Sequence, residues 1–328
     1  MKSRFLYVCF IVFSFFQYIY GADITFSLEP VASLKASNTK EALFFDGYFG
    51  TDSSEKCSQL EWREKFVLYY GLQVYSEIST EKNSFLISAG FDIAFPYNKG
   101  KMTDSDWNKW GEKSTYSEFE NKADRCYDFS ASFLYERKLT DTLRLSPSFY
   151  ARYSHLSFVA ENGHGWYYMD TESPHYYPDG KYHLAGIEYE SEKISFFFNV
   201  SIQKTCTEKI SFFIGCGISP LTYAVATDRH LGSKDYYVTK DYIYAWFSDY
   251  RFFTGINFQF SPMCSLNTTI TTNYMRFTKG EEYYDWDDGS KDTLSSQDAG
   301  YEYYDIAFRI GVKIILFGRK RGGNDARL

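Results

Sequence analysis

Apolar and polar residues alternate with a period of two along much of the chain. In the segment 305–317, DIAFRIGVKIILF, the even positions are apolar, and the odd positions up to Lys313 carry charged or small residues. The segment 85–95 alternates in the same way, with Ser88, Gly90 and Asp92 on the polar side. Successive side chains of a strand point to opposite faces, so this period predicts strands with one apolar and one polar face.

The alternation predicts ten strands, joined alternately by short and long connections. Short connections fall at 139–141, 205–208 and 261–262, and long polar segments lie near 100–120, 161–180, 228–236 and 281–298. The predicted strands are 24–46, 58–76, 83–98, 122–138, 142–160, 181–203, 209–228, 235–260, 263–280 and 299–317.

Strands with one apolar face fit a sandwich or a lipocalin-like fold as well as a membrane barrel. Long strands, an aromatic content of 21% and the alternating connection lengths favour the membrane barrel. We therefore predict an all-β fold: a ten-stranded antiparallel transmembrane β-barrel with extended extracellular loops. An even strand number places both ends in the periplasm and the long segments at the cell exterior.

The first 22 residues indicate export. Lys2 and Arg4 precede an apolar run from Phe5 to Tyr20, and the small residues Gly21 and Ala22 follow. This pattern is typical of a secretory signal peptide, and the alternative is an uncleaved anchor helix. The predicted organisation is a signal peptide at 1–22, a barrel domain at 23–317 and a basic periplasmic tail at 318–328.

Composition excludes some classes of function. The net charge of −7 argues against a nucleic-acid-binding protein, which requires a basic surface. The cysteines after residue 22 are odd in number and lack close pairs, so they predict neither a disulfide scaffold nor a zinc site. A bridge between Cys206 and Cys264 is the pairing left open. No dimerisation signal is present, so we expect a monomer. These cysteines are Cys57, Cys126, Cys206, Cys216 and Cys264.

The stretch GKMTDSDW at 100–107 places two aspartates two residues apart. In an extended chain Asp104 and Asp106 point to the same side. Two such carboxyls can share a proton or a water molecule, because ionising both costs repulsion. Taken alone, the pair also fits a polar turn or a weak cation site.

A second pair, Asp228 and His230, stands near the end of the seventh predicted strand. The apolar residues of this strand are even-numbered up to Ile218 and odd-numbered after Pro220. Proline occurs in sheets mainly at edges and bulges, and a bulge shifts the facing pattern by one residue. The shift turns Asp228 and His230 toward the lumen, where the carboxylate would make the imidazole a general base. Taken alone, His230 also fits a surface histidine.

The order and spacing of these motifs resemble the omptins, a family of outer-membrane endopeptidases. The matching pieces are TKE at 39–41, SQLEW at 58–62, the 100–107 run and DRH at 228–230. Together they span essentially the whole mature chain.

The resemblance implies that Asp104 with Asp106 and Asp228 with His230 form two catalytic couples facing each other across a groove. A water between them would be activated without a covalent intermediate or a metal, and no cofactor is expected. Glu41 matches a family acid that binds basic substrate side chains, whereas Ala226 stands where a second acid is usual. The preference for cleavage beside basic residues is therefore open.

Ser114 matches a peripheral substrate-binding serine of the family. Omptins also require lipopolysaccharide, and the residues that would bind such a lipid here cannot be assigned from the sequence. The expected partners are polypeptides at the cell surface and outer-membrane lipid. The competing hypothesis is a non-catalytic barrel acting as an adhesin, ligand binder or narrow porin. A ten-stranded barrel disfavours a pore, because side chains largely fill so narrow a lumen.

Overall fold

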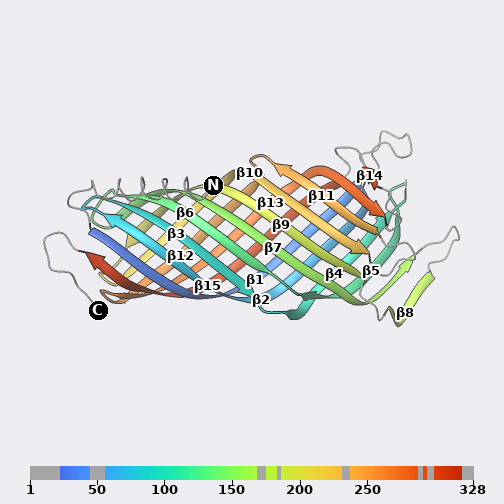
Figure 1. Cartoon of the computed structure of the whole chain (residues 1–328), viewed down its shortest axis with the longest axis horizontal. Helices are drawn as coiled ribbons and strands as arrows, with labels where there is room; N and C mark the ends of the chain where they lie inside the picture. The colour runs from blue at the N-terminus through green and yellow to red at the C-terminus, as the bar shows by residue number, and fades with distance from the viewer. Residues whose placement is uncertain are drawn as a thin grey trace, which may run out of the picture.

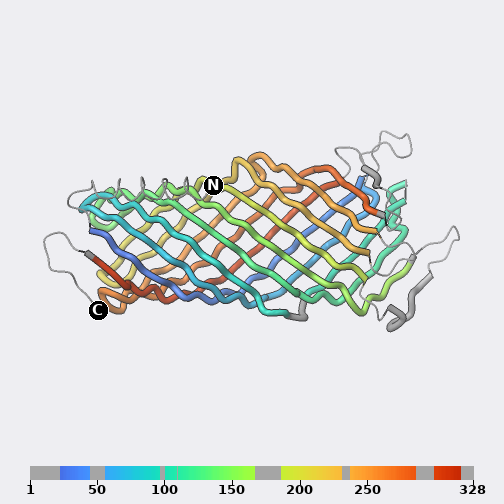
Figure 2. The backbone as a smooth tube through the Cα atoms, viewed as in Figure 1, coloured from blue at the N-terminus to red at the C-terminus, as the bar shows by residue number. Residues whose placement is uncertain are grey.

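Antiparallel strands close into one barrel, as the computed structural model of the chain shows (Figure 1). Three wall strands are each built from two consecutive elements: β3 continues into β4, β5 into β6, and β11 into β12. Counted this way, the ring contains the ten predicted strands. Figure 2 follows the same walls as continuous, tilted traces.

The structure describes residues 23–44, 56–108, 110–167, 175–182, 186–230, 237–286, 291–293 and 299–319. The strands are β1 Asp23–Phe44, β2 Lys56–Ser79, β3 Asn83–Ala94, β4 Tyr97–Trp107, β5 Lys113–Ala123, β6 Tyr127–Lys138, β7 Leu143–Tyr167, β8 His175–Tyr182, β9 Ile187–Thr205, β10 Ile210–His230, β11 Tyr237–Ala245, β12 Asp249–Ser261, β13 Cys264–Trp286, β14 Lys291–Thr293 and β15 Ala299–Arg319.

The barrel is much longer than a membrane is thick. Strand β7 has 25 residues, or about 80 Å of extended chain, whereas a membrane-spanning strand needs about ten. Exposed apolar side chains occupy only part of each wall. On β15 they alternate along its C-terminal two thirds, and on β9 they are confined to the half that follows Phe197. The β15 set is Ile306, Phe308, Ile310, Val312, Ile314 and Leu316.

The other half of the barrel therefore projects beyond the apolar band. The elements β4, β5, β8, β11 and β14 gather there, at the right in Figure 1, and we call this the site end. Within the described part of β4 and β5 no large apolar side chain is strongly exposed. The outer face of this projecting wall is polar because water, not lipid, surrounds it.

Charged side chains fill the lumen within the apolar band. Arg152 lies between two carboxylates, with Nη2 2.9 Å from Asp128 Oδ1 and Nη1 3.0 Å from Asp305 Oδ2. Lys35 Nζ lies 3.1 Å from Asp128 Oδ2. Buried charges of opposite sign satisfy one another, so a polar lumen can be packed without an open channel.

Strand breaks separate the site end from the apolar band on two sides of the ring. One set lies in β2 at Phe66, which has a φ of 53°, and between β3 and β4. The other lies in β10 between Ile218 and Leu221, and between β11 and β12 at Phe247, which has a φ of 50°. The wall at the site end can thus follow a different path from the wall within the apolar band.

The predicted fold class is confirmed, with two corrections. Much of the segment 100–120, predicted as a long connection, belongs to the hairpin of β4 and β5, which extends the barrel wall. Much of the segment 161–180, also predicted as a long connection, belongs to β7, which runs to Tyr167, and to β8, which begins at His175. The five cysteines from Cys57 to Cys264 are all free, so Cys206 and Cys264 are not bridged. The described residues contain no helix long and apolar enough to span a membrane.

The predicted signal peptide lies outside the described residues. Strand β15 continues to Arg319, two residues into the predicted tail, and the rest of that tail is likewise outside the described ranges.

Candidate active site

The two sequence pairs stand on opposite walls at the site end. Asp104 and Asp106 lie on β4, and Asp228 and His230 lie at the end of β10. Around the ring, β4 and β10 are separated by β5, β7 and β9 in one direction and by five wall strands in the other. Strands so placed face each other across the lumen.

All four residues line one cavity of about 150 Å³, which we call the site cavity. Its volume accommodates several water molecules. Its wall includes side chains from β1, β2, β4, β10, β11 and β13. The lining residues are Glu41, Ala42, Leu43, Ser58, Leu60, Asp104, Asp106, Asp228, His230, Tyr237, Thr239, Asp241, Glu282 and Tyr284.

The predicted bulge in β10 is present. Between the pairs Ile218–Phe198 and Leu221–Phe196, two residues of β10 stand opposite one of β9. The Ser219 hydroxyl accepts a hydrogen bond from the Phe196 backbone N–H at 3.2 Å and donates one to the Leu221 carbonyl at 2.7 Å. Ser219 thereby satisfies backbone groups around Pro220, and the shifted register turns Asp228 and His230 inward, as predicted.

An aromatic platform lies in the barrel core on the walls that carry the site. Trp62 of β2 is fully buried and stacks on Tyr189 of β9, with ring centroids 4.9 Å apart. Phe158 of β7 stacks on Trp62 at 5.9 Å. Tyr189 pairs directly with Asp228 in the β9–β10 ladder, and Trp62 lies on β2, which pairs with the β4 segment that carries Asp104. The platform therefore links the wall of Asp228 to the neighbour of the wall of Asp104. Rigid support of this kind is what a preorganised site requires.

Burial alters the ionisation of the Asp104–Asp106 couple. The site lies beyond the apolar band, in the projecting wall. Burial first, and then the neighbouring Asp106 and Asp228 carboxylates, raise the pKa of Asp104 to about 8. Burial also raises the pKa of Asp106, while the hydroxyls of Ser58 and Thr115 oppose this rise. At neutral pH the couple therefore retains one proton on Asp104.

The Asp228–His230 couple is shifted in the complementary direction. Burial lowers the pKa of His230 to about 4, so its imidazole is neutral and can accept a proton. Burial raises the pKa of Asp228 to about 6, against the opposing effect of Glu41 and the Thr239 hydroxyl. Asp228 is thus ionised at neutral pH. A neutral base beside a carboxylate is the arrangement that general-base chemistry needs.

Three further acids line the same cavity. Glu41, Asp241 and Glu282 are 4%, 5% and 2% exposed. Glu41 shares a side-chain hydrogen bond with Asp228 and accepts one from Tyr189, whereas Asp241 Oδ1 has no hydrogen-bond partner among the described residues. Burial and the nearby Asp228 and Asp241 raise the pKa of Glu41, and burial with Glu282 and Asp228 raises that of Asp241. In the part of the chain that the structure describes, no lysine or arginine lines this cavity.

Asp241 and Tyr237 were not predicted from the sequence. Asp241 pairs across strands with Ala226, the position where the family pattern led us to expect an acid. Glu282 pairs with Asp241 in turn. The alternation in YVTKDYIYA at 237–245 places Asp241 on one face of the strand. Only the register of this strand against β10 shows that this face points inward.

Ser114 does not line the site cavity. In the β4–β5 ladder Thr115, not Ser114, pairs with Asp106. The ladder shifts register here, because Trp107 pairs with Lys113, and Ser114 is the residue left without a partner in that ladder. Its predicted role in substrate binding stays a prediction.

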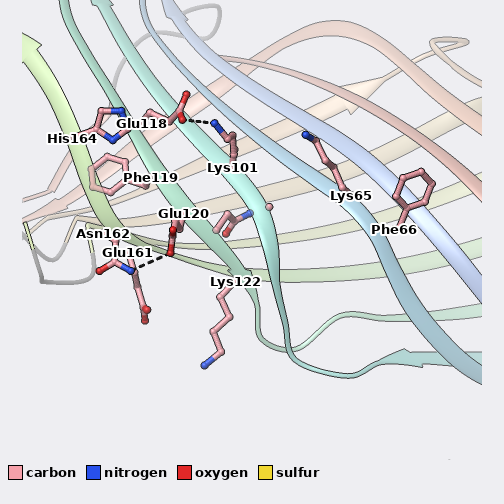
Figure 3. Close-up of a pocket in the computed structure, with 12 residues that line it drawn as sticks. Lys65, Phe66, Lys101, Glu118, Phe119, Glu120, Lys122, Glu161, Asn162 and His164 are labelled. Carbon is pink, nitrogen blue, oxygen red and sulfur yellow. Dashed lines mark hydrogen bonds and ion pairs between the residues drawn. The ribbon is translucent and has the colours of Figure 1, made fainter. Parts of the chain in front are cut away.

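A larger hollow of about 610 Å³ lies between β2, β4, β5 and β7, away from both couples (Figure 3). Two of its acids have partners: Lys101 pairs with Glu118, and the Asn162 side-chain amide donates to Glu120 at 3.1 Å. It also contains His164, which pairs with Glu118 across the β5–β7 ladder, but Glu118 is already held by Lys101 and no second carboxyl couple faces this pair among the lining residues described. Within the described residues no group of three or more His, Cys, Asp or Glu side chains is arranged to hold a metal.

The fold and site together define a class: a long transmembrane β-barrel that holds facing carboxyl–carboxyl and carboxyl–imidazole couples beyond its apolar band. The model of the Omptin family matches residues 29–316, and the chain belongs to the Omptin family. The resemblance inferred from the motifs is therefore confirmed.

Among solved structures, the outer membrane protease OmpT from Escherichia coli matches with a TM-score of 0.77 and 17% identity, over 89% of this chain and 96% of that one. This likeness shows the shared fold. Two other barrels match far less well. The NalP translocator domain from Neisseria meningitidis matches with a TM-score of 0.33 and 10% identity, over 87% of this chain and 88% of that one. The CymD monoaromatic hydrocarbon channel matches with a TM-score of 0.29 and 7% identity, over 89% of this chain and 88% of that one. No curated protein matches the sequence.

Proposed function

We propose that the protein is an endopeptidase that activates water between the Asp104–Asp106 and Asp228–His230 couples. The observation that carries this proposal is that both couples line one water-sized cavity from opposite walls. Family membership and the fold shared with an outer membrane protease support the same activity.

In the proposed reaction the substrate peptide bond lies across the site cavity. Neutral His230 accepts a proton as the water oxygen bonds to the carbonyl carbon, and ionised Asp228 stabilises the resulting imidazolium. The Asp104–Asp106 couple, which holds one proton, binds the attacking water. When the C–N bond breaks, His230 returns its proton to the leaving amine, so the imidazole ends neutral.

The site end would face the cell exterior, because the connections at the opposite end are the short ones. The hairpins β6–β7, β9–β10 and β12–β13 are closed there by the connections predicted as short. Substrates would then be polypeptides at the cell surface. A lipid requirement of the lipopolysaccharide type stays an expectation, so activity should be assayed with and without that lipid.

The buried acids favour substrates with a cationic side chain next to the scissile bond. Glu41 and Asp241 lack a cation among the residues that line the site cavity. A buried carboxylate that no cation neutralises is costly, and an arginine or lysine side chain supplies the missing positive charge. Asp241, on the neighbouring strand, thereby supplies an acid beside Ala226, where the family pattern has one.

A peptide library is expected to be cleaved by the wild-type barrel in lipid and not by Asp104→Asn. Replacing Asp104 removes half of the couple that holds the water, so kcat/KM should fall at least about a hundredfold. The matched control is Asp141→Asn, whose fully exposed carboxylate lies in the short connection between β6 and β7. Wild-type protein that cleaves no peptide in any lipid would exclude the protease and favour the adhesin alternative.

The pH dependence of kcat/KM is expected to be bell-shaped, with limbs near pH 6 and pH 8. Below the pKa of Asp228, about 6, its carboxylate is neutral and no longer stabilises the imidazolium. Above the pKa of Asp104, about 8, the couple carries two negative charges and repels the developing oxyanion. Steady-state cleavage from pH 5 to pH 10 measures both limbs. An activity that rises steadily to pH 10 would contradict the proton assigned to Asp104.

A further inference from the structure

Tyr237 lies against the imidazole of the site. It pairs directly with His230 across the β10–β11 ladder, and their rings stack with centroids 4.2 Å apart and planes inclined by 18°. Tyr284 follows Tyr237 in the row, with centroids 6.0 Å apart. The three rings join β10, β11 and β13 at the site cavity.

The two tyrosine hydroxyls have different surroundings. Burial and then Asp104, Asp228 and Asp106, which belong to both couples, raise the pKa of Tyr237. For Tyr284, burial and then Glu282 raise the pKa, which places its hydroxyl among the acids that we assign to substrate recognition. Tyr237 is thus a neutral O–H donor near both couples.

Peptide hydrolysis needs a donor for the oxygen that becomes anionic on the scissile carbonyl. The backbone N–H groups of the surrounding strands are largely used by the barrel ladders. Among the described side chains that line the site cavity, Ser58 and Thr239 are the other hydroxyl donors besides the tyrosines. Their hydroxyls interact with Asp106 and Asp228, and the proton of Asp104 belongs to the couple that binds the attacking water.

We propose that Tyr237 is a further catalytic residue, whose hydroxyl donates a hydrogen bond to the oxyanion while its ring holds the His230 imidazole in place. This role rests on the proposed function. It involves no proton transfer from Tyr237, because the phenol only donates a hydrogen bond that strengthens as the carbonyl oxygen gains charge.

The test compares Tyr237→Phe with Tyr284→Phe in lipid, using a peptide that wild type cleaves. Both changes remove one oxygen and keep the ring. Loss of an oxyanion donor is expected to lower kcat on the order of a hundredfold for Tyr237→Phe, with KM within about twofold. Tyr284→Phe is expected to change KM and to leave kcat within about threefold. The acid limb of the pH profile should stay near pH 6 in Tyr237→Phe, because the ring stack on His230 persists.

A phosphinic peptide, whose tetrahedral anion imitates the intermediate, gives a second measurement independent of turnover. Its Ki should rise in Tyr237→Phe by about the factor lost in kcat/KM, whereas the Ki of an uncleaved ground-state peptide should not change. A Tyr237→Phe variant with nearly wild-type kcat and unchanged phosphinate binding overturns this role alone. Wild-type protein without peptidase activity overturns the proposed function, and this role with it.

Discussion

A His230→Ala variant is expected to lose roughly 10²–10⁴ of the wild-type kcat/KM. Burial lowers the pKa of the imidazole to about 4, so His230 is a neutral base throughout the working pH range. Among the described residues, no other histidine lines the site cavity. The variant therefore has no second imidazole there to accept the proton of the water.

Cleavage of one fluorogenic peptide by wild type and variant, at equal amounts of folded barrel, measures this loss. His164→Ala is the matched control, because His164 lies in the larger hollow away from both couples. Added imidazole should restore part of the activity of His230→Ala, because the vacated space lies against the ring of Tyr237. Retention of more than about a tenth of the activity would remove His230 from the mechanism.

The double variant Glu41→Gln/Asp241→Asn is expected to lose the preference for cationic side chains. Wild type should cleave a peptide with arginine beside the scissile bond much faster than the same peptide with citrulline, which has nearly the same shape and no charge. Pairing of a close buried charge with an opposite charge is worth about 1.5–7 kcal/mol, so this preference should exceed roughly tenfold. In the double variant the ratio of kcat/KM values should approach one.

The control for this experiment is Glu192→Gln, because Glu192 of β9 does not line the site cavity and its side chain accepts a hydrogen bond from Tyr153. Its arginine-to-citrulline ratio should equal that of wild type. Each single variant of the acid pair should give an intermediate ratio if both acids contact the cation. A double variant that still prefers arginine would assign the selectivity to other residues.

The membrane-embedded part of the fold was predictable because its two faces differ. Lipid outside and packed polar groups inside impose the strict alternation seen from Asp305 to Phe317, and the structure reproduces it as β15. The segment from Tyr97 to Ala123 lacks this alternation, since water bathes its outer face and a polar cavity its inner one. Its strands β4 and β5 were accordingly predicted in large part as a connection.

The candidate site was predictable only where its residues are neighbours in sequence. Asp104 with Asp106 and Asp228 with His230 are each two apart, so their strands present them together whatever the register. Asp241 and Tyr237 reach the site through the pairing of β11 with β10, and Glu282 through that of β13 with β11. Register between strands depends on the whole ring and cannot be derived from one segment.

The buried carboxyls of Glu41 and Asp241 also couple recognition to the uptake and release of protons. In the free protein, burial and the neighbouring carboxylates raise the pKa values of both groups well above the ordinary range, which favours their protonated forms. An arriving cation favours the ionised forms and drives these protons into the solvent, so affinity should increase as the medium becomes more alkaline. Catalysis declines over the same range as Asp104 ionises. Peptide capture and peptide cleavage therefore have opposite preferences for acidity, and the best working condition lies where the two balance.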